Sequence, residues 1–191
     1  MTRRILLVED EGNLIEQAKQ ELELIYDQYP VQVSDGRGKF RTTMEFGRRY
    51  EFIQTKLPRV KDHLYWRELG VGAEDLVVLD LNFKNYVDPD TRQRIALSFS
   101  GKDVLRVLDA DKKRGGLPGL ERVLIATSMK AEVDPKQVSP DIALLDGFKV
   151  YGLEKAIGQN GQIMGYGRSL AEKIHQIYEG VQGMPIEYLN Q

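Results

Sequence analysis

Two apolar stretches of this chain end in carboxylates. The run Ile5–Val8 is followed at once by the acids of 9–11, and the run 76–81 carries Asp80 near its end. Burying such a charge is costly unless a cation or a proton compensates it. If both runs are strands of one parallel sheet, their carboxyl ends meet at one edge. The acids would then form an oxygen-rich pocket of the kind that Mg²⁺ prefers.

Other reactive groups follow later apolar runs. The run 123–127 ends in Thr127 and is followed by Ser128, and Lys149 lies in a shorter run at 148–151. A carboxylate can attack phosphorus, while a metal ion, a hydroxyl and an ammonium neutralise the transferred group. The set therefore predicts phosphoryl-transfer chemistry. Lys130 and Lys155 remain open alternatives to Lys149 as the source of the ammonium.

The elements that must position these groups alternate between apolar runs and helical periodicity, which is typical of an α/β sheet with crossover helices. The expected strands are residues 5–8, 31–33, 76–81, 123–127 and 148–151, with 142–145 as a further short candidate. Helical spacing of apolar residues, capping boxes and closing prolines predict the helices. The expected helices are 14–25, closed by Pro30, then 42–57, one beginning at Ser100 and one beginning at Ser169.

Composition sets outer limits on the class of protein. The chain has 191 residues, a formal net charge of −2 and no cysteine, and 41% of its residues are hydrophobic. Disulfides and cysteine-based zinc sites are thereby excluded, and no global charge favours nucleic acid. No apolar run approaches the roughly 20 residues that span a bilayer. We expect one domain over 1–191 in the cytoplasm, without membrane or direct nucleic-acid contacts.

In order and in type, these segments resemble the receiver domain of two-component response regulators. Residues 6–11 are similar to the first strand of that family with its acidic pair, and 77–81 to the phosphoacceptor strand. Residues 123–128 resemble the fourth strand with its switch hydroxyl. Residues 148–151 resemble the strand that carries the family's lysine.

The resemblance implies a role for each matching residue. Asp80 would accept a phosphoryl group from a histidine kinase or a phosphotransfer protein, and Thr127 and Lys149 would contact the phosphoryl oxygens. The implied Mg²⁺ ligands are Glu9, Asp10, Asp80 and the backbone carbonyl of Asn82. Glu11 is assigned to the start of the following helix.

The implied fold is flavodoxin-like: a doubly wound, five-stranded parallel sheet in the order 2-1-3-4-5. The protein would be a stand-alone signalling switch rather than an enzyme, with a downstream protein partner. The formation of a homodimer is left open.

The sequence departs from the family in three places. Val150 follows Lys149, whereas the family has a proline after its lysine. Asp146 occupies the position three residues before Lys149, where the family has an aromatic residue. The motifs are also unusually far apart in the chain. The spacing predicts insertions near 58–75 and 83–98, and residues 180–191 are expected to be an irregular tail. These departures keep open a pseudo-receiver that binds proteins without phosphotransfer. A Mg²⁺-dependent phosphohydrolase is a weaker alternative, because Asn82 stands where a second acid would be needed.

Overall fold

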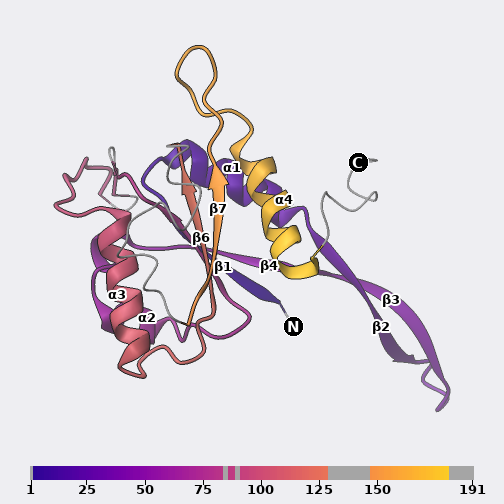
Figure 1. Cartoon of the computed structure of the whole chain (residues 1–191). Coiled ribbons are helices and arrows are strands. Elements are labelled where there is room, and N and C mark those ends of the chain that lie inside the picture. The colour runs from indigo at the N-terminus through magenta and orange to yellow at the C-terminus, as the bar shows by residue number, and fades with distance from the viewer. Residues whose placement is uncertain (1, 84–85, 89–90, 129–146, 181–191) are drawn as a thin grey trace.

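The computed structural model describes residues 2–83, 86–88, 91–128 and 147–180 of the chain. Its centre is a sheet of five parallel strands in the order β4-β1-β5-β6-β7 (Figure 1). The strands are β1 (Arg3–Val8), β4 (Tyr50–Gln54), β5 (Leu76–Asp80), β6 (Arg122–Thr127) and β7 (Lys149–Glu154). The expected α/β class with a five-stranded parallel sheet is confirmed, and the architecture is consistent with a flavodoxin-like fold.

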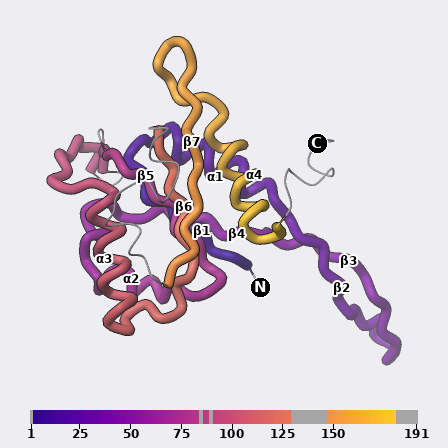
Figure 2. The backbone as a smooth tube through the Cα atoms, in the orientation of Figure 1, coloured from indigo at the N-terminus to yellow at the C-terminus, as the bar shows by residue number. Residues whose placement is uncertain are grey.

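Helices cover both faces of this sheet (Figures 1 and 2). One face carries α1 (Gly12–Glu23) and α4 (Tyr166–Glu179), which pack against each other. The other face carries η1 (Leu57–Arg59), α2 (His63–Glu68) and α3 (Gly101–Lys113). None of the described helices combines the length and the apolar character that crossing a bilayer requires.

The central strands are buried because helices lie on both of their faces. Side chains alternate along a strand, so Ile5 and Leu7 contact the α1–α4 core while Leu6 and Val8 contact the α2–α3 core. Every residue of β5 is buried in the same way. The strands predicted at 5–8, 76–81 and 123–127 are confirmed. The candidate strand at 142–145 lies outside the described residues.

The start of α3 lies directly beside the end of β5. Ser100 and Asp103 form the predicted capping box, with the Ser100 N–H donating to Asp103 Oδ2 at 2.9 Å. The Gly101 N–H donates to the carbonyl of Leu81 at 3.1 Å. A Cβ atom at Gly101 would overlap the Asp80 carbonyl, so only glycine allows this approach.

Two predicted helix boundaries are wrong. Helix α1 ends at Glu23, well before Pro30, which lies inside a strand. Helix α4 begins at Tyr166 rather than at Ser169, after Gly165 in the left-handed conformation with φ 60°. The Ser169 N–H donates to the Gly165 carbonyl within the first turn, so Ser169 is an interior residue of the helix.

The largest error concerns residues 26–57. The helix expected over 42–57 is wrong, because residues 40–48 form a strand of a hairpin and 50–54 form β4. The hairpin consists of β2 (Tyr26–Ser34) and β3 (Phe40–Arg48), paired antiparallel outside the main sheet.

The predicted strand order 2-1-3-4-5 is wrong in its second strand. Residues 31–33 were expected to form the edge strand beside β1, but they belong to β2 of the hairpin. Strand β4 takes that edge instead and pairs parallel with β1.

The described residues of the segments expected as insertions pack against the body of the protein. Between β4 and β5, η1 and α2 cover the sheet, and the buried Trp66 donates from Nε1 to the Val60 carbonyl at 2.8 Å. After β5, Phe83 packs edge-on against Phe99 with ring centroids 5.7 Å apart. Both segments therefore contribute to the α2–α3 core.

Candidate functional site

Three carboxylates meet at the carboxyl end of the sheet. Val8 of β1 pairs with Leu79 of β5, and this register brings Glu9 and Asp10 level with Asp80. One carboxylate oxygen of each acid lies within 4.8 Å of those of the other two, and all three residues are buried. The structure thus brings together the three acids that the sequence singled out.

A buried ammonium completes the cluster. Lys155 Nζ lies 2.7 Å from Glu9 Oε2 and 3.3 Å from Asp80 Oδ1. Its side chain is only 2% exposed. Lys155 directly follows β7, and its backbone N–H donates to the Thr127 carbonyl at 2.8 Å, which holds it at the carboxyl end of the sheet.

Lys149 does not belong to this site. It is the first residue of β7, pairs with Arg122 at the start of β6, and is exposed. A parallel strand brings only its last residues to the carboxyl edge, so Lys149 lies at the opposite edge of the sheet from the carboxylates. The structure therefore places Lys155, which the sequence left open as an alternative, beside the carboxylates in place of Lys149.

The remaining predicted residues lie around the cluster. Thr127 is the last residue of β6 and is fully buried. A backbone hydrogen bond from Asn82 reaches the Asp80 carboxylate. Glu11 is the N-cap of α1, where its carbonyl accepts from the N–H groups of the first helical turn. Lys130 and Asp146 lie outside the described residues.

The electrostatics of the pocket reflect an excess of buried negative charge. Burial raises the pKa of Glu9 to about 8, and the Lys155 ammonium lowers it only in part. Burial likewise raises the pKa of Asp80 to about 6, against the effects of Lys155 and the Asn82 hydrogen bond. Burial lowers the pKa of Lys155, but the charges of Glu9 and Asp80 outweigh that effect and raise it.

Tyr166, the first residue of α4, lies beside the ammonium. Lys155 Nζ is 5.3 Å from the centre of the Tyr166 ring, a distance at which a cation interacts with an aromatic face. The ring is 1% exposed, and its hydroxyl makes no hydrogen bond among the described residues. Burial and the charges of Glu9 and Asp80 raise the pKa of the Tyr166 phenol well above its usual value.

A groove of about 660 Å³ lies next to the cluster. Its walls come from the start of α1, from Ser128 after β6 and from the loop 157–165. Because Glu11 and Ser128 directly follow Asp10 and Thr127 in the chain, the groove adjoins the residues at the ends of β1 and β6.

The arrangement suits a hard divalent cation. Three carboxylates and one ammonium leave the pocket with a net negative charge when all are ionised, and a cation offsets the cost of burying that charge. The available ligand atoms are oxygens, which is the donor set of Mg²⁺. The geometry fits Glu9, Asp10 and Asp80 as the residues that would hold the ion.

Comparisons with known proteins add no relationship: no protein-family model matches the chain, and no curated protein is significantly similar to it.

Proposed function

We propose that this chain forms a receiver, a signalling switch in which Asp80 accepts a phosphoryl group with Mg²⁺ as cofactor. The donor would be a histidine kinase or a phosphotransfer protein. One observation carries the proposal: the Lys155 ammonium lies 3.3 Å from Asp80 inside a cluster of three buried carboxylates. Nucleophile, cation ligands and charge-neutralising ammonium thus occupy one pocket, where phosphoryl transfer needs them.

Asp80 is the acid best suited to attack phosphorus. With a pKa of about 6 it is largely ionised at neutral pH, whereas Glu9 is largely protonated in the absence of a cation. An Asp80 oxygen forms a bond to phosphorus while the bond from phosphorus to the donor's imidazole nitrogen breaks. That nitrogen keeps the electron pair, and the product is an aspartyl phosphate.

The other residues of the pocket stabilise the transferred group. Mg²⁺ bound by Glu9, Asp10, Asp80 and the Asn82 carbonyl would supply positive charge to the phosphoryl oxygens. The Lys155 ammonium neutralises a second part of that charge, and the Thr127 hydroxyl donates a hydrogen bond.

Phosphorylation would reach a partner protein through the ends of β6 and β7. The hydrogen bond from the Lys155 N–H to the Thr127 carbonyl couples the two residues that would contact the phosphoryl group. New bonds to that group draw Lys155 away from Glu9 and change the surface formed by Ser128 and the loop 157–165. A two-state surface of this kind suits output by protein contact.

Intact-mass spectrometry after incubation with acetyl phosphate and Mg²⁺ tests the proposal. We expect one added phosphoryl group on the wild-type chain, none on Asp80→Asn, and much slower addition to Lys155→Ala. Lys149→Ala is the matched control and should behave as the wild type. An adduct that persists in Asp80→Asn, or its absence in a wild-type chain that binds Mg²⁺, contradicts the proposal.

One observation favours a second candidate, a pseudo-receiver that binds its partner constitutively. The resemblance expects an aromatic residue three positions before the lysine, and before Lys155 that position is Gly152 of β7. A switch without this ring lacks one of the parts that transmit phosphorylation. A chain that neither binds Mg²⁺ nor forms the adduct would support this candidate.

A further inference from the structure

The β2–β3 hairpin, here called the arm (residues 26–48), projects away from the sheet and its helices (Figures 1 and 2). Its strands pair along nine residues each, from Tyr26 opposite Arg48 to Ser34 opposite Phe40. An isolated two-stranded hairpin is at best marginally stable in water, so an arm of this length favours a partner that covers it.

The arm has two chemically different faces. Residues paired across the strands share a face, so one face carries five successive rows. These rows are Ser34/Phe40, Gln32/Thr42, Pro30/Met44, Gln28/Phe46 and Tyr26/Arg48. We call it the apolar face, because its only charged residue is Arg48 at the base of the arm.

The large apolar side chains of this face lie in water. Phe40 is 69% exposed, Phe46 65%, Met44 51% and Tyr26 49%. They form a stripe that runs the length of the arm. On the reverse face Tyr29 is 44% exposed, and its ring lies against Gly47 across the strands.

Apart from Arg48, the charges of the arm lie off the apolar face. Asp27, Glu45 and Arg41 are on the reverse face, and Arg37 and Lys39 are in the turn at the tip. Apart from Arg48 at the base, the apolar face offers no cation to a nucleic acid and no charge to steer an acidic protein. Its other rows carry no charge, so they can meet an identical copy of themselves without like-charge repulsion.

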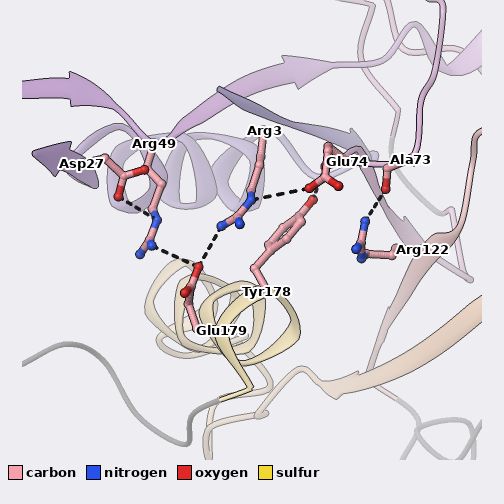
Figure 3. A network of polar contacts seen from close by, with 8 residues as sticks. All are labelled: Arg3, Asp27, Arg49, Ala73, Glu74, Arg122, Tyr178 and Glu179. Atoms are coloured by element: carbon pink, nitrogen blue, oxygen red, sulfur yellow. Dashed lines mark hydrogen bonds and ion pairs between the residues drawn. The ribbon is translucent and has the colours of Figure 1, made fainter. Parts of the chain in front are cut away.

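The base of the arm is fixed to the body by ion pairs, as Figure 3 shows. Arg49 Nε lies 3.0 Å from Asp27 Oδ1 of β2, and Arg49 Nη2 lies 3.0 Å from Glu179 Oε1 at the end of α4. Arg3 Nη1 of β1 contacts the same Glu179 oxygen at 2.8 Å. Such a base presents the apolar face in a defined direction.

The exposed area matches what a pair of arms needs. At about 150–250 Å² for each large side chain, the four exposed residues present roughly 450 Å² per chain. Two copies would bury about twice that apolar area, and the polar side chains between them bring the total near the lower limit of about 1,200 Å² for specific interfaces.

We propose that the apolar face of the arm is the contact surface of a homodimer, in which the arms of two copies stack face to face around a two-fold axis. In such an isologous contact the same surface serves both chains, and the charged reverse faces remain in water. The central row, Pro30/Met44, lies nearest the axis. This interface does not depend on phosphorylation.

Sedimentation equilibrium of the full chain is the first test. We expect the wild type to dimerise at concentrations on the order of 10 μM, as an interface of this size allows. Phe40→Thr with Phe46→Thr should be monomeric, since threonine keeps the strand but removes the aromatic area. The control with Val31→Thr and Val33→Thr, on the reverse face, should dimerise as the wild type does.

Cross-linking locates the interface, and the chain offers a clean background because it has no cysteine. Under mild oxidation Met44→Cys, near the axis, should form a disulfide-linked dimer, whereas Thr43→Cys on the reverse face should not. A wild type that stays monomeric at about 100 μM overturns the proposal. A dimer that survives the two phenylalanine substitutions, or equal cross-linking of both cysteine variants, also overturns it.

Discussion

The ammonium of Lys155 lies 2.7 Å from Glu9 Oε2, and the two residues are 146 positions apart in the chain. Neither side chain has meaningful contact with water, since they are 2% and 0% exposed. This pair ties the end of β7 to the end of β1 across the site. Removing Lys155 leaves the buried carboxyl groups of Glu9 and Asp80 without their ammonium partner.

Replacing Lys155 by methionine should therefore destabilise the fold by about 3–5 kcal/mol at neutral pH. Lys149→Met, at the exposed first position of β7, should change the free energy of unfolding by no more than about 0.5 kcal/mol. Urea unfolding followed by circular dichroism measures both. Equal effects of the two substitutions would show that the Lys155 ammonium does not stabilise the buried carboxyl groups.

The free energy of unfolding should depend on pH because the pKa values of the Glu9 and Asp80 carboxyl groups are raised in the folded chain. Because burial raises the pKa of Glu9 and Asp80, the folded chain holds protons that the unfolded chain releases. Their contribution to stability is therefore full below the unfolded pKa values and is lost as pH rises through the folded ones. Without divalent cations, the site should lose up to about 1.4 kcal/mol per pH unit for each retained proton between about pH 5 and pH 8.

Urea unfolding in EDTA at several pH values measures this loss, and subtraction of the Asp80→Asn profile isolates the site from other groups such as His175. Added Mg²⁺ should restore stability most strongly at the alkaline end, since it binds the ionised carboxylates. A difference profile in which the wild type gains stability with rising pH would show that the pocket holds no excess negative charge.

The environment of the Tyr166 hydroxyl predicts that removing this group stabilises the fold. This buried hydroxyl lacks a hydrogen bond among the described residues, so Tyr166→Phe should stabilise the fold by about 1 kcal/mol. The matched control is Tyr65→Phe, because the Tyr65 hydroxyl accepts from the Lys56 N–H at 2.9 Å. That substitution should cost about 1 kcal/mol. Thermal unfolding of the two variants reports both signs, and destabilisation by Tyr166→Phe would mean that its hydroxyl has a partner.

The contact between α3 and β5 explains a glycine at position 101. Gly101→Ala places a Cβ against the Asp80 carbonyl and should cost about 1–3 kcal/mol or more. Gly12→Ala, at the first position of α1, meets nothing within 4 Å and should stabilise the fold by about 0.4–1 kcal/mol. Chemical denaturation distinguishes them, and a neutral Gly101→Ala would contradict the close packing at the end of β5.

The sequence predicted correctly those elements whose residue pattern fits only one kind of secondary structure. Continuous apolar runs such as 5–8 and 76–79 fit strands covered on both faces, and that is where they lie. The pattern of residues 40–57 fits both a helix and a strand. Phe46, Tyr50, Ile53 and Leu57 have helical spacing, but Phe40 to Phe46 also alternate with a period of two. The turn at 35–39, where Asp35 accepts from two backbone N–H groups, decides for the hairpin.

The residues of the site likewise include some that could be predicted from the sequence and some that could not. Glu9, Asp10 and Asp80 were predictable because each directly follows or ends a buried strand. The lysine was misplaced because β7 was expected to end at residue 151, whereas it continues to Glu154 and brings Lys155 to the carboxyl edge. Tyr166 has no local signal, since its position beside Lys155 arises only when α4 packs against the sheet.

Locating the phosphoryl group itself tests Asp80 as the acceptor. Borohydride reduces an aspartyl phosphate to an alcohol, and peptide mass spectrometry of the reduced chain identifies the residue changed. After treatment with acetyl phosphate and Mg²⁺, we expect modification at Asp80 alone, and we expect it to be lost when Mg²⁺ is removed. Modification at Glu9 or Asp10, or an adduct that forms equally well without Mg²⁺, would contradict this expectation.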